Sequence, residues 1–234
     1  MTSLKQRQVS QTLTQVLLDR KFMATSELRE LVVKLNTKFD YNLDIKQDRS
    51  LDEYIGTMNI SLARLHLKIV QTRDESTGER LIVLCNTLAS NLSLHPELSE
   101  QQMALFRTLV ERIATASDGH IPHHQALYAV CEIPNCKLSE AQAEQTINEL
   151  IRQKYLESGP KQRLSLSPVA LVELGPYIVS LLEDKVIKCA ACSSLCLQGM
   201  HCSTTDCPAK LHHACAKKLV ACRLCKKKWN KPVR

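Results

Sequence analysis

Apolar residues recur every three or four positions through the first sixty or so residues of the chain, as they do on the buried face of an amphipathic helix. Three such segments are separated by short polar stretches, and the second is expected to begin at a Ser26 cap. The pattern therefore predicts three helices in this part of the chain. Their apolar faces are Val9, Leu13, Val16 and Leu17; then Leu28, Leu31, Val32 and Leu35; then Leu51, Tyr54, Ile55 and Met58.

The periodicity changes from helical to alternating at about residue 62. Residues 62–72 alternate apolar and polar side chains, residues 73–80 hold turn-forming residues including Gly78, and residues 81–86 return as a second apolar stretch. Two such stretches joined by a turn predict a β-hairpin. Three helices followed by a hairpin is the order of a winged-helix domain, and we assign residues 1–95 to a first domain of this kind.

The same order returns in residues 96–184. Ser99 with Gln102, and Ser139 with Gln142, have the spacing of a capping box, and Pro122 is expected to open a short helix between those two. A strand is expected to begin at residues 155–156 and to return at 164–167. A last helix from Pro168 is expected to break at residues 175–176, because proline removes a backbone donor. The sequence thus predicts a second winged-helix domain over residues 96–184.

Eight of the eleven cysteines lie in one short window between Cys189 and Cys225. Paired spacings such as C-x2-C place two thiolates on one zinc ion, which takes four nitrogen or sulfur ligands in a tetrahedron. An even number of cysteines also fits a disulfide framework, but the first residues contain no apolar signal core, so thiols kept for metal are expected. Four pairs predict two Zn2+ ions, bound by Cys189, Cys192, Cys202, Cys207, His212, Cys215, Cys222 and Cys225.

The pairs are compatible with two arrangements, a sequential one and a cross-brace in which pairs one and three share a metal. The order of four cysteines, a histidine and three cysteines fits the cross-brace of RING and PHD modules. One site would then hold Cys189, Cys192, His212 and Cys215, and the other Cys202, Cys207, Cys222 and Cys225. We assign residues 185–228 to this RING-like domain and residues 229–234 to a basic tail. The predicted fold class is mainly α with small β-hairpins, as tandem winged-helix domains followed by a two-zinc RING-like domain.

Other cysteines and histidines compete for these roles. Cys196 is expected to be a buried or spare thiol, because its use would leave a neighbouring cysteine idle. His212, and not His213, leaves the two-residue gap to Cys215 that a compact chelate turn prefers. His201 is expected at the surface or behind a ligand. The cysteines outside the window are expected to be structural: Cys85, Cys131 and Cys136.

Charge separates the last fifty residues from the rest. The whole chain has a net charge of +7, whereas residues 185–234 alone hold eleven Lys and Arg and one acid. A basic tail predicts either a weak nucleic-acid contact or a solvated end. The third helix of the second winged-helix domain is expected to face outward with Glu140, Glu144 and Glu149, which a phosphate backbone would repel. This domain is therefore expected to bind protein rather than DNA. No apolar run reaches the length of a membrane span.

Together these motifs resemble the non-structural maintenance of chromosomes element 1 family, the RING-like subunits of the complex built on the fifth and sixth SMC proteins. The match is carried by the two C-x2-C pairs, the His212-x2-Cys215 pair and the segment SLCLQGMHC at 194–202. The gap from Cys202 to Cys207 is wider than the two residues expected there. The resemblance implies an E3 ubiquitin ligase of DNA repair and recombination, located in the nucleus on chromatin. It also implies a MAGE-type partner with tandem winged helices, a kleisin-type subunit and a ubiquitin-charged E2 enzyme.

A RING ligase has no nucleophile of its own and works by positioning the E2-ubiquitin thioester. By analogy with other RING domains, the candidates for E2 contact are Ala191, Leu224 and Lys226. The first chelate turn offers only small side chains, and no proline follows the seventh ligand, so activity that depends on the partner subunit is expected. The alternative is a non-enzymatic assembly module, in which the metal-binding domain is a structural or PHD-like brace.

Overall fold

The computed structural model describes residues 4–88, 98–183 and 186–229. By their internal contacts they form two units, one of Met1–Arg73 with Glu79–Ala89 and one of Asp74–Gly78 with Ser90–Arg234. The predicted domain limits at 95–96 and 184–185 lie outside the described residues, and the limits as a whole stay predictions. Within the described residues, no helix is both long and apolar enough to cross a membrane.

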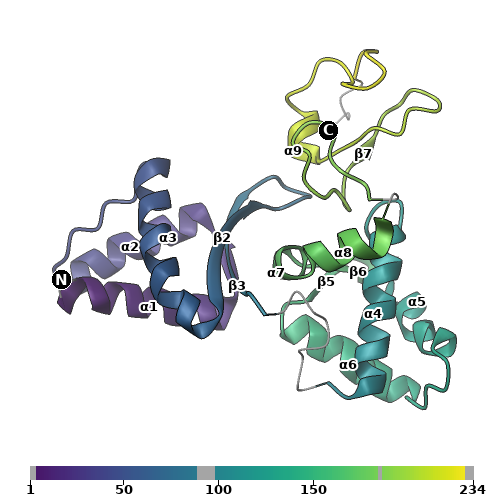
Figure 1. Cartoon of the computed structure of the whole chain (residues 1–234), viewed down its shortest axis with the longest axis horizontal. Coiled ribbons are helices and arrows are strands. Elements are labelled where there is room, and N and C mark those ends of the chain that lie inside the picture. Colours follow the sequence, from purple (N-terminus) through teal and green to yellow (C-terminus); the bar gives the residue numbers. More distant parts are fainter. Residues whose placement is uncertain (1–3, 89–97, 184–185, 230–234) are drawn as a thin grey trace. The chain divides into compact units, whose positions relative to one another are not determined.

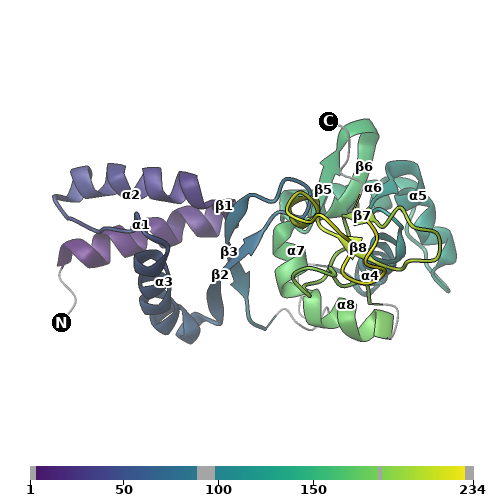
Figure 2. The same ribbon diagram turned by 90° about the horizontal axis from the view of Figure 1, so that it is seen from above.

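The first unit is three helices and a small antiparallel sheet, as the periodicity predicts (Figure 2). Its elements are α1 (Leu4–Arg20), β1 (Phe22–Ala24), α2 (Thr25–Phe39), α3 (Asp48–Leu62), the 3-10 turn η1 (Ala63–Leu65), β2 (Leu67–Arg73) and β3 (Arg80–Asn86). The sheet has the order β1-β3-β2, and Ile82 in its central strand pairs with both Met23 and Gln71. Most of the predicted apolar face residues are buried in one core, while Val16 and Leu31 pack at its edge.

Two local expectations in this unit are wrong, and one strand was not predicted. Helix α2 begins at Thr25, after an extended Ala24 without a side-chain cap, so Ser26 does not cap it. The predicted strand over 62–72 begins only at Leu67, because a 3-10 turn ends at His66 in the left-handed conformation (φ 54°). Strand β1 was not expected, since its three residues become a strand only by pairing with β3, which is distant in sequence.

The second unit contains the repeated helix–hairpin order. Its elements up to residue 182 are α4 (Glu100–Thr115), β4 (Ile121–Pro122), α5 (His123–Tyr128), η3 (Ala129–Glu132), α6 (Glu140–Arg152), β5 (Leu156–Gly159), η4 (Pro160–Gln162), β6 (Arg163–Leu166), α7 (Pro168–Glu173) and α8 (Gly175–Leu182). Both predicted capping boxes are confirmed, because the Ser99 and Ser139 side chains each accept from the backbone of a glutamine three residues later. The fully buried Phe106 of α4 packs edge-on against Tyr155 in this core.

The expected break in the last helix is also confirmed. Helix α7 ends at Glu173, and α8 starts at Gly175 with Pro176 in its first turn. Figure 1 shows α8 lying beside α4, and the two helices pack against each other. Pro122 precedes α5 rather than starting it, because residues 121–122 pair with β6 in a sheet of order β4-β6-β5. The predicted fold class of mainly helical units with small antiparallel sheets is therefore confirmed.

Ser167 joins the hairpin to helix α7. Its fully buried hydroxyl accepts from the Ala170 N–H and donates to the carbonyl of Lys154. We expect Ser167→Ala to destabilise this unit by about 1–2 kcal/mol, because it removes an N-cap and leaves a carbonyl unpaired. A lowered thermal midpoint of the full chain checks this, with exposed Ser203→Ala as the control. Equal midpoints for the two variants would contradict it.

The last described segment, residues 186–229, is called the Cys/His module below. Its regular elements are short: β7 (Met200–His201), β8 (Lys210–Leu211) and α9 (His213–Ala216). Its own buried cluster consists largely of cysteines and alanines with Leu211 and Trp229. A core this small does not bury enough apolar surface to stabilise a segment with so little regular structure.

Candidate metal centre

The two C-x2-C segments of the Cys/His module fold into equivalent turns. The Cys189 carbonyl accepts from the Ser193 N–H, and the Cys222 carbonyl accepts from the Lys226 N–H. Ser193 and Lys226, each directly after a second cysteine, have left-handed φ values of 62° and 61°. This shared geometry turns both thiols of each pair to the same side.

The first quartet consists of Cys189, Cys192, His212 and Cys215, whose ligand atoms all lie within 4.8 Å of one another. The Nδ1 atom of His212 lies 3.4 Å from Cys192 Sγ and 4.0 Å from Cys215 Sγ. His212 stands directly before helix α9, and Cys215 lies within that helix. The chain order thus brings pairs one and three together, as a cross-brace requires.

The second quartet consists of Cys202, Cys207, Cys222 and Cys225, which meet the same distance limit. Cys202 Sγ lies 3.7 Å from Cys225 Sγ, and Cys207 Sγ lies 3.8 Å from Cys222 Sγ. The wide gap between Cys202 and Cys207 is accommodated by a turn with left-handed Asp206, at φ 62°. Pairs two and four therefore form the second candidate site, and the sequential arrangement is not the one adopted.

These spacings fit a tetrahedral metal. Sulfur ligands about 2.3 Å from zinc have an S–S separation of about 3.8 Å, and a sulfur and a nitrogen ligand lie about 3.5 Å apart. The S–S distances of 3.7 and 3.8 Å and the shorter Sγ–Nδ1 distance of 3.4 Å match these values. All eleven cysteines are free thiols, so the quartets are not disulfides. Each quartet is able to hold one metal ion.

The pKa shifts of the quartet thiols differ in direction, and one thiol in each quartet has a lowered pKa. Burial raises the pKa of Cys189, but backbone N–H groups of Cys192, His212 and Ala191 outweigh it and lower the pKa to about 6. The Thr204 hydroxyl and the Lys227 N–H lower the pKa of Cys225 to about 6. Cys207 belongs to the same quartet as Cys225. The Ala209 N–H lowers its pKa, but burial and the neighbouring thiols together raise it to about 11. Four adjacent thiolates need a cation, because without one they do not all ionise together.

The competing cysteines and histidines lie outside both quartets. Cys196 is fully buried beside Gly199, where an added Cβ would approach its sulfur to 2.7 Å. His213 begins helix α9, and His201 Nε2 lies 3.3 Å from the Ser117 carbonyl oxygen. Cys85 is buried in β3, whereas Cys131 is exposed and Cys136 is half-buried. The expectation of a structural role therefore has no support from burial at Cys131.

Two charged side chains bind the backbone of residues 197–198, between the two chelate turns. Neither was identified from the sequence. Glu75 accepts from the Leu197 and Gln198 N–H groups at 3.1 and 2.8 Å. The Lys210 ammonium donates to the carbonyls of Leu197 and Ser117 at 2.6 and 2.8 Å. The backbone of Leu197 is thus bound on both sides, by a carboxylate at its N–H and by an ammonium at its C=O. No motif marks either residue, and their partners are distant in the sequence, so the sequence alone gives no sign of these contacts.

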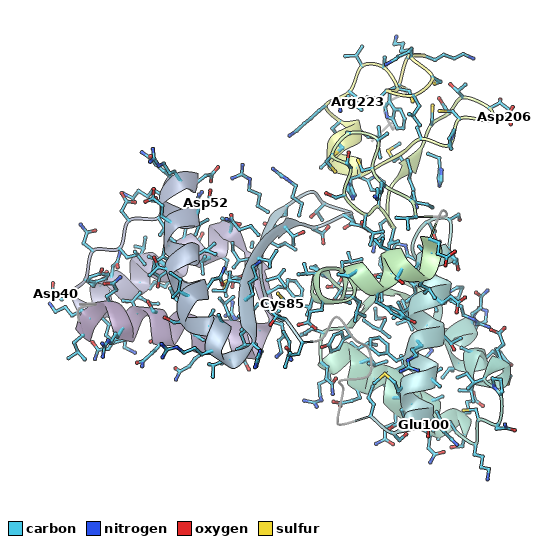
Figure 3. The ribbon with its side chains drawn as sticks, in the orientation of Figure 1. Asp40, Asp52, Cys85, Glu100, Asp206 and Arg223 are labelled. Atoms are coloured by element: carbon cyan, nitrogen blue, oxygen red, sulfur yellow. The ribbon has the colours of Figure 1, made fainter. Side chains whose placement is uncertain are left out.

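The residues predicted to contact an E2 enzyme lie on the two C-x2-C turns. Leu224 is 58 % exposed and nearby Val220 is 75 % exposed, while Lys226 is exposed and Ala191 half-buried. The Arg223 guanidinium donates to the Ala191 carbonyl at 3.1 Å and so ties the last turn to the first. Figure 3 labels Arg223 and Asp206 on separate loops of the module. The structure therefore joins the two turns and leaves apolar side chains exposed beside them.

Comparison with known proteins adds the family. The sequence model described as Nse1 non-SMC component of SMC5-6 complex matches residues 10–174. The chain belongs to this Nse1 family. The match ends before the Cys/His module, so residues 10–174 carry the family assignment. The family expected from the sequence motifs is confirmed.

Curated relatives carry the same family name. The human and bovine proteins named non-structural maintenance of chromosomes element 1 homolog are each 27% identical over 169 residues, which is 72% of this chain and 62% of theirs. The Xenopus tropicalis homolog is 26% identical over 213 residues, 88% of this chain and 74% of its own. A chain of a solved structure titled Nse1-Nse3-Nse4 complex aligns with a TM-score of 0.81 at 22% identity, covering 96% of this chain and 97% of that one. This last likeness supports the fold.

Proposed function

We propose that this protein is the RING-type E3 ubiquitin ligase subunit of an SMC5-6 complex, acting in DNA repair and recombination on nuclear chromatin. The observation that carries the proposal is the pair of crossed Cys/His quartets, attached to two helix–hairpin units of an Nse1-family chain. Zinc is the metal proposed for both quartets, because the donors are seven thiols and one imidazole at tetrahedral spacing. Bound zinc would supply the folding energy of the module.

The helix–hairpin units would dock the other subunits. The related solved chain comes from a complex titled with Nse3 and Nse4, which supports a MAGE-type and a kleisin-type partner for this chain. The surface of α6 agrees with protein rather than DNA contact. Glu140 is exposed, and Glu144 and Glu149 are half-buried beside His123 and Arg152. The helix was expected to face outward with all three acids, whereas only Glu140 is fully exposed. Arg152 is the one Lys or Arg of α6 and is paired with Glu149, so the helix offers phosphate little attraction.

Transfer would proceed by positioning, since neither quartet offers a free nucleophile. The module would hold an E2-ubiquitin thioester so that an acceptor lysine attacks it at high effective concentration. Leu224 and Val220 supply exposed apolar surface for the E2 enzyme, and the ammonium of Lys226 follows the last ligand. Ala191 adds only a small contact, which makes support from a partner subunit part of the proposal.

Ubiquitin transfer in a reconstituted system tests the proposal. The full chain, alone and with its MAGE-type partner, is incubated with ubiquitin, E1 and a panel of E2 enzymes. The control is a Cys189→Ala/His212→Ala variant. We expect transfer above that control, strongest in the presence of the partner. Transfer equal to that of the control with every E2 enzyme would refute the ligase proposal.

The surface prediction separates this proposal from its alternative. We expect Leu224→Ala to lower the transfer rate roughly 5- to 30-fold, as the loss of an apolar anchor does at an interface. Assembly with the partner should be unchanged, because the side chain is exposed and outside both quartets. Val179→Ala, which also removes an exposed apolar side chain, is the control. Rates are measured by E2-ubiquitin discharge onto free lysine.

The alternative is a non-enzymatic assembly brace, and the Arg223–Ala191 contact favours it because it closes the two chelate turns on each other. A brace predicts that quartet variants lose complex assembly, while Leu224 and Lys226 variants behave as wild type in every assay. The proposed nucleic-acid contact of the basic tail is separate. Residues 230–234 lie outside the described part of the chain, so that contact stays a prediction, tested by whether affinity falls with salt.

A further inference from the structure

The turn Asp74–Gly78 connects β2 to β3, yet by its contacts it belongs with the Cys/His module. Its Glu75 side chain is 7 % exposed, which is unusual for a carboxylate and requires partners. Those partners are the two backbone N–H groups of Leu197 and Gln198 and the imidazole of His212. The turn therefore places a buried charge directly behind one candidate metal ligand.

The contacts of His212 determine which of its nitrogens carries the proton. Nε2 lies 2.9 Å from the carbonyl oxygen of Leu195 and 3.3 Å from Glu75 Oε1. Both partners are acceptors, so Nε2 must be the N–H donor. Nδ1 is then left with its lone pair and faces the sulfurs of Cys192 and Cys215. This is the tautomer that a metal bound at Nδ1 requires.

Internal hydrogen bonds and one close contact hold the turn in place. Asp74 Oδ1 accepts from the N–H groups of Ser76 and Thr77 at 3.0 and 2.6 Å and from both of their hydroxyls, which fixes the turn around Glu75. Gly78 has a φ of 77°, and a Cβ there would lie 2.2 Å from the Cβ of Ala214. The turn thus touches the His212–Cys215 segment at a second point, where only glycine fits.

We propose that Glu75 is a positioning residue of the first quartet. Together with the nearer Leu195 carbonyl it holds the proton of His212 on Nε2 and fixes the ring orientation, and so slows metal release from that site. A carboxylate that accepts from the remote N–H of a metal-bound histidine is a recognised outer partner of metal sites. The partner here comes from 137 residues earlier in the chain. The inference rests on the proposed metal role of the quartet.

The second quartet provides an internal reference in the same molecule. The full chain is loaded with 113Cd2+, whose NMR signal distinguishes a site of three thiolates and one imidazole from a site of four thiolates, and release to excess EDTA is followed at each signal. We expect Glu75→Ala to release metal from the first quartet roughly 10- to 100-fold faster, the usual cost of losing such an outer partner. Release from the second quartet should be unchanged. Glu75→Gln should fall between, because its amide keeps one acceptor oxygen.

One further measurement, on the His212 ring itself, separates the positioning role from a merely structural one. In zinc-loaded chain, 15N NMR of the His212 ring should show the proton on Nε2, and its exchange with water should quicken in Glu75→Ala. Gly78→Val, which unseats the turn by bulk rather than by charge, should reproduce the faster release. Glu30→Ala, at an exposed glutamate of α2, is the matched control and should release metal as wild type does.

The outcomes are distinct. Unchanged release in Glu75→Ala, or equal acceleration at both quartets, would overturn the positioning role and leave the metal assignment standing. If the wild-type chain binds no cadmium or zinc, the metal assignment itself falls, and the role of Glu75 falls with it.

Discussion

Removal of the proposed metal ions is expected to unfold the Cys/His module while helices α4 to α8 stay folded. The module contains two-residue strands and one four-residue helix, and its buried cluster is largely the ligands themselves. Apparent binding energies of structural zinc are about 10–16 kcal/mol in small domains, more than such a segment gains from apolar burial. In contrast, α4 and α6 bury seven and four side chains in a core that consists mainly of residues 103–182 and includes Leu197 of the module.

The measurement is an amide NMR spectrum of the full chain before and after excess EDTA. Signals of residues 186–229 should collapse to unfolded positions, those of residues 100–182 should persist, and added Zn2+ should restore the first set. EDTA already saturated with zinc is the control. Dispersed module signals in metal-free protein would show that the fold does not depend on the ion.

Single substitutions separate the two sites. Cys222→Ser should reduce the metal content from two ions per chain to about one, or to none if the crossed quartets fold together. Cys196→Ser is the matched control, since that thiol is buried in the same module but belongs to neither quartet. It should keep both ions. Metal loss in Cys196→Ser equal to that in Cys222→Ser would mean that the ligand set is wrong.

The features that could be predicted from the sequence are those that depend on residues close together in the chain. Helix faces follow from a period of about 3.6 residues, and the capping boxes at Ser99 and Ser139 follow from contacts three residues apart. The quartets follow from the same logic, because a C-x2-C turn is a local structure and the order of pairs restricts how they cross. The helix faces, the caps and each single ligand pair were predictable because the partner residues are neighbours in the chain. How the pairs cross was inferred from their order, because the crossed pairs are about twenty residues apart.

The missed features depend on distant partners. Strand β1 exists only because Phe22–Ala24 pairs with β3, some sixty residues later. The failed Ser26 cap shows that a capping residue does not fix a helix start when the preceding segment is drawn into a sheet. Glu75 and Lys210 read as ordinary surface charges, yet tertiary contacts bury both. Neither periodicity nor spacing carries that information.

Lys210 is expected to be the most sensitive residue outside the quartets. Its side chain is 1 % exposed, and its ammonium donates to the carbonyl of Leu197 within the module and to that of Ser117 beyond α4. Burial lowers its pKa, so the environment disfavours the charge, and the two carbonyls offset that cost. Lys210 lies in β8, where it pairs with His201 of β7, and its two carbonyl partners place the ammonium at the junction of module and helices.

Lys210→Ala should destabilise this junction by roughly 2–4 kcal/mol, because it leaves two buried carbonyls unpaired and a cavity where the stem was. Hydrogen exchange in metal-loaded chain measures the effect at the Cys196 and Cys202 N–H groups, which donate to Ile187 and Ala209. Their exchange should quicken by about 30- to 1000-fold. Lys217→Ala, on the exposed side of the same module, should change it little.

Lys210→Met distinguishes the two causes of this loss. Methionine keeps most of the apolar stem and removes the donors, so its effect measures the unpaired carbonyls, and the difference from alanine measures the cavity. We expect methionine to retain most of the destabilisation, because two carbonyls lose their partner while little volume is lost. If Lys210→Met exchanged like wild type, the ammonium would be dispensable, and packing of the stem alone would hold the module against Ser117.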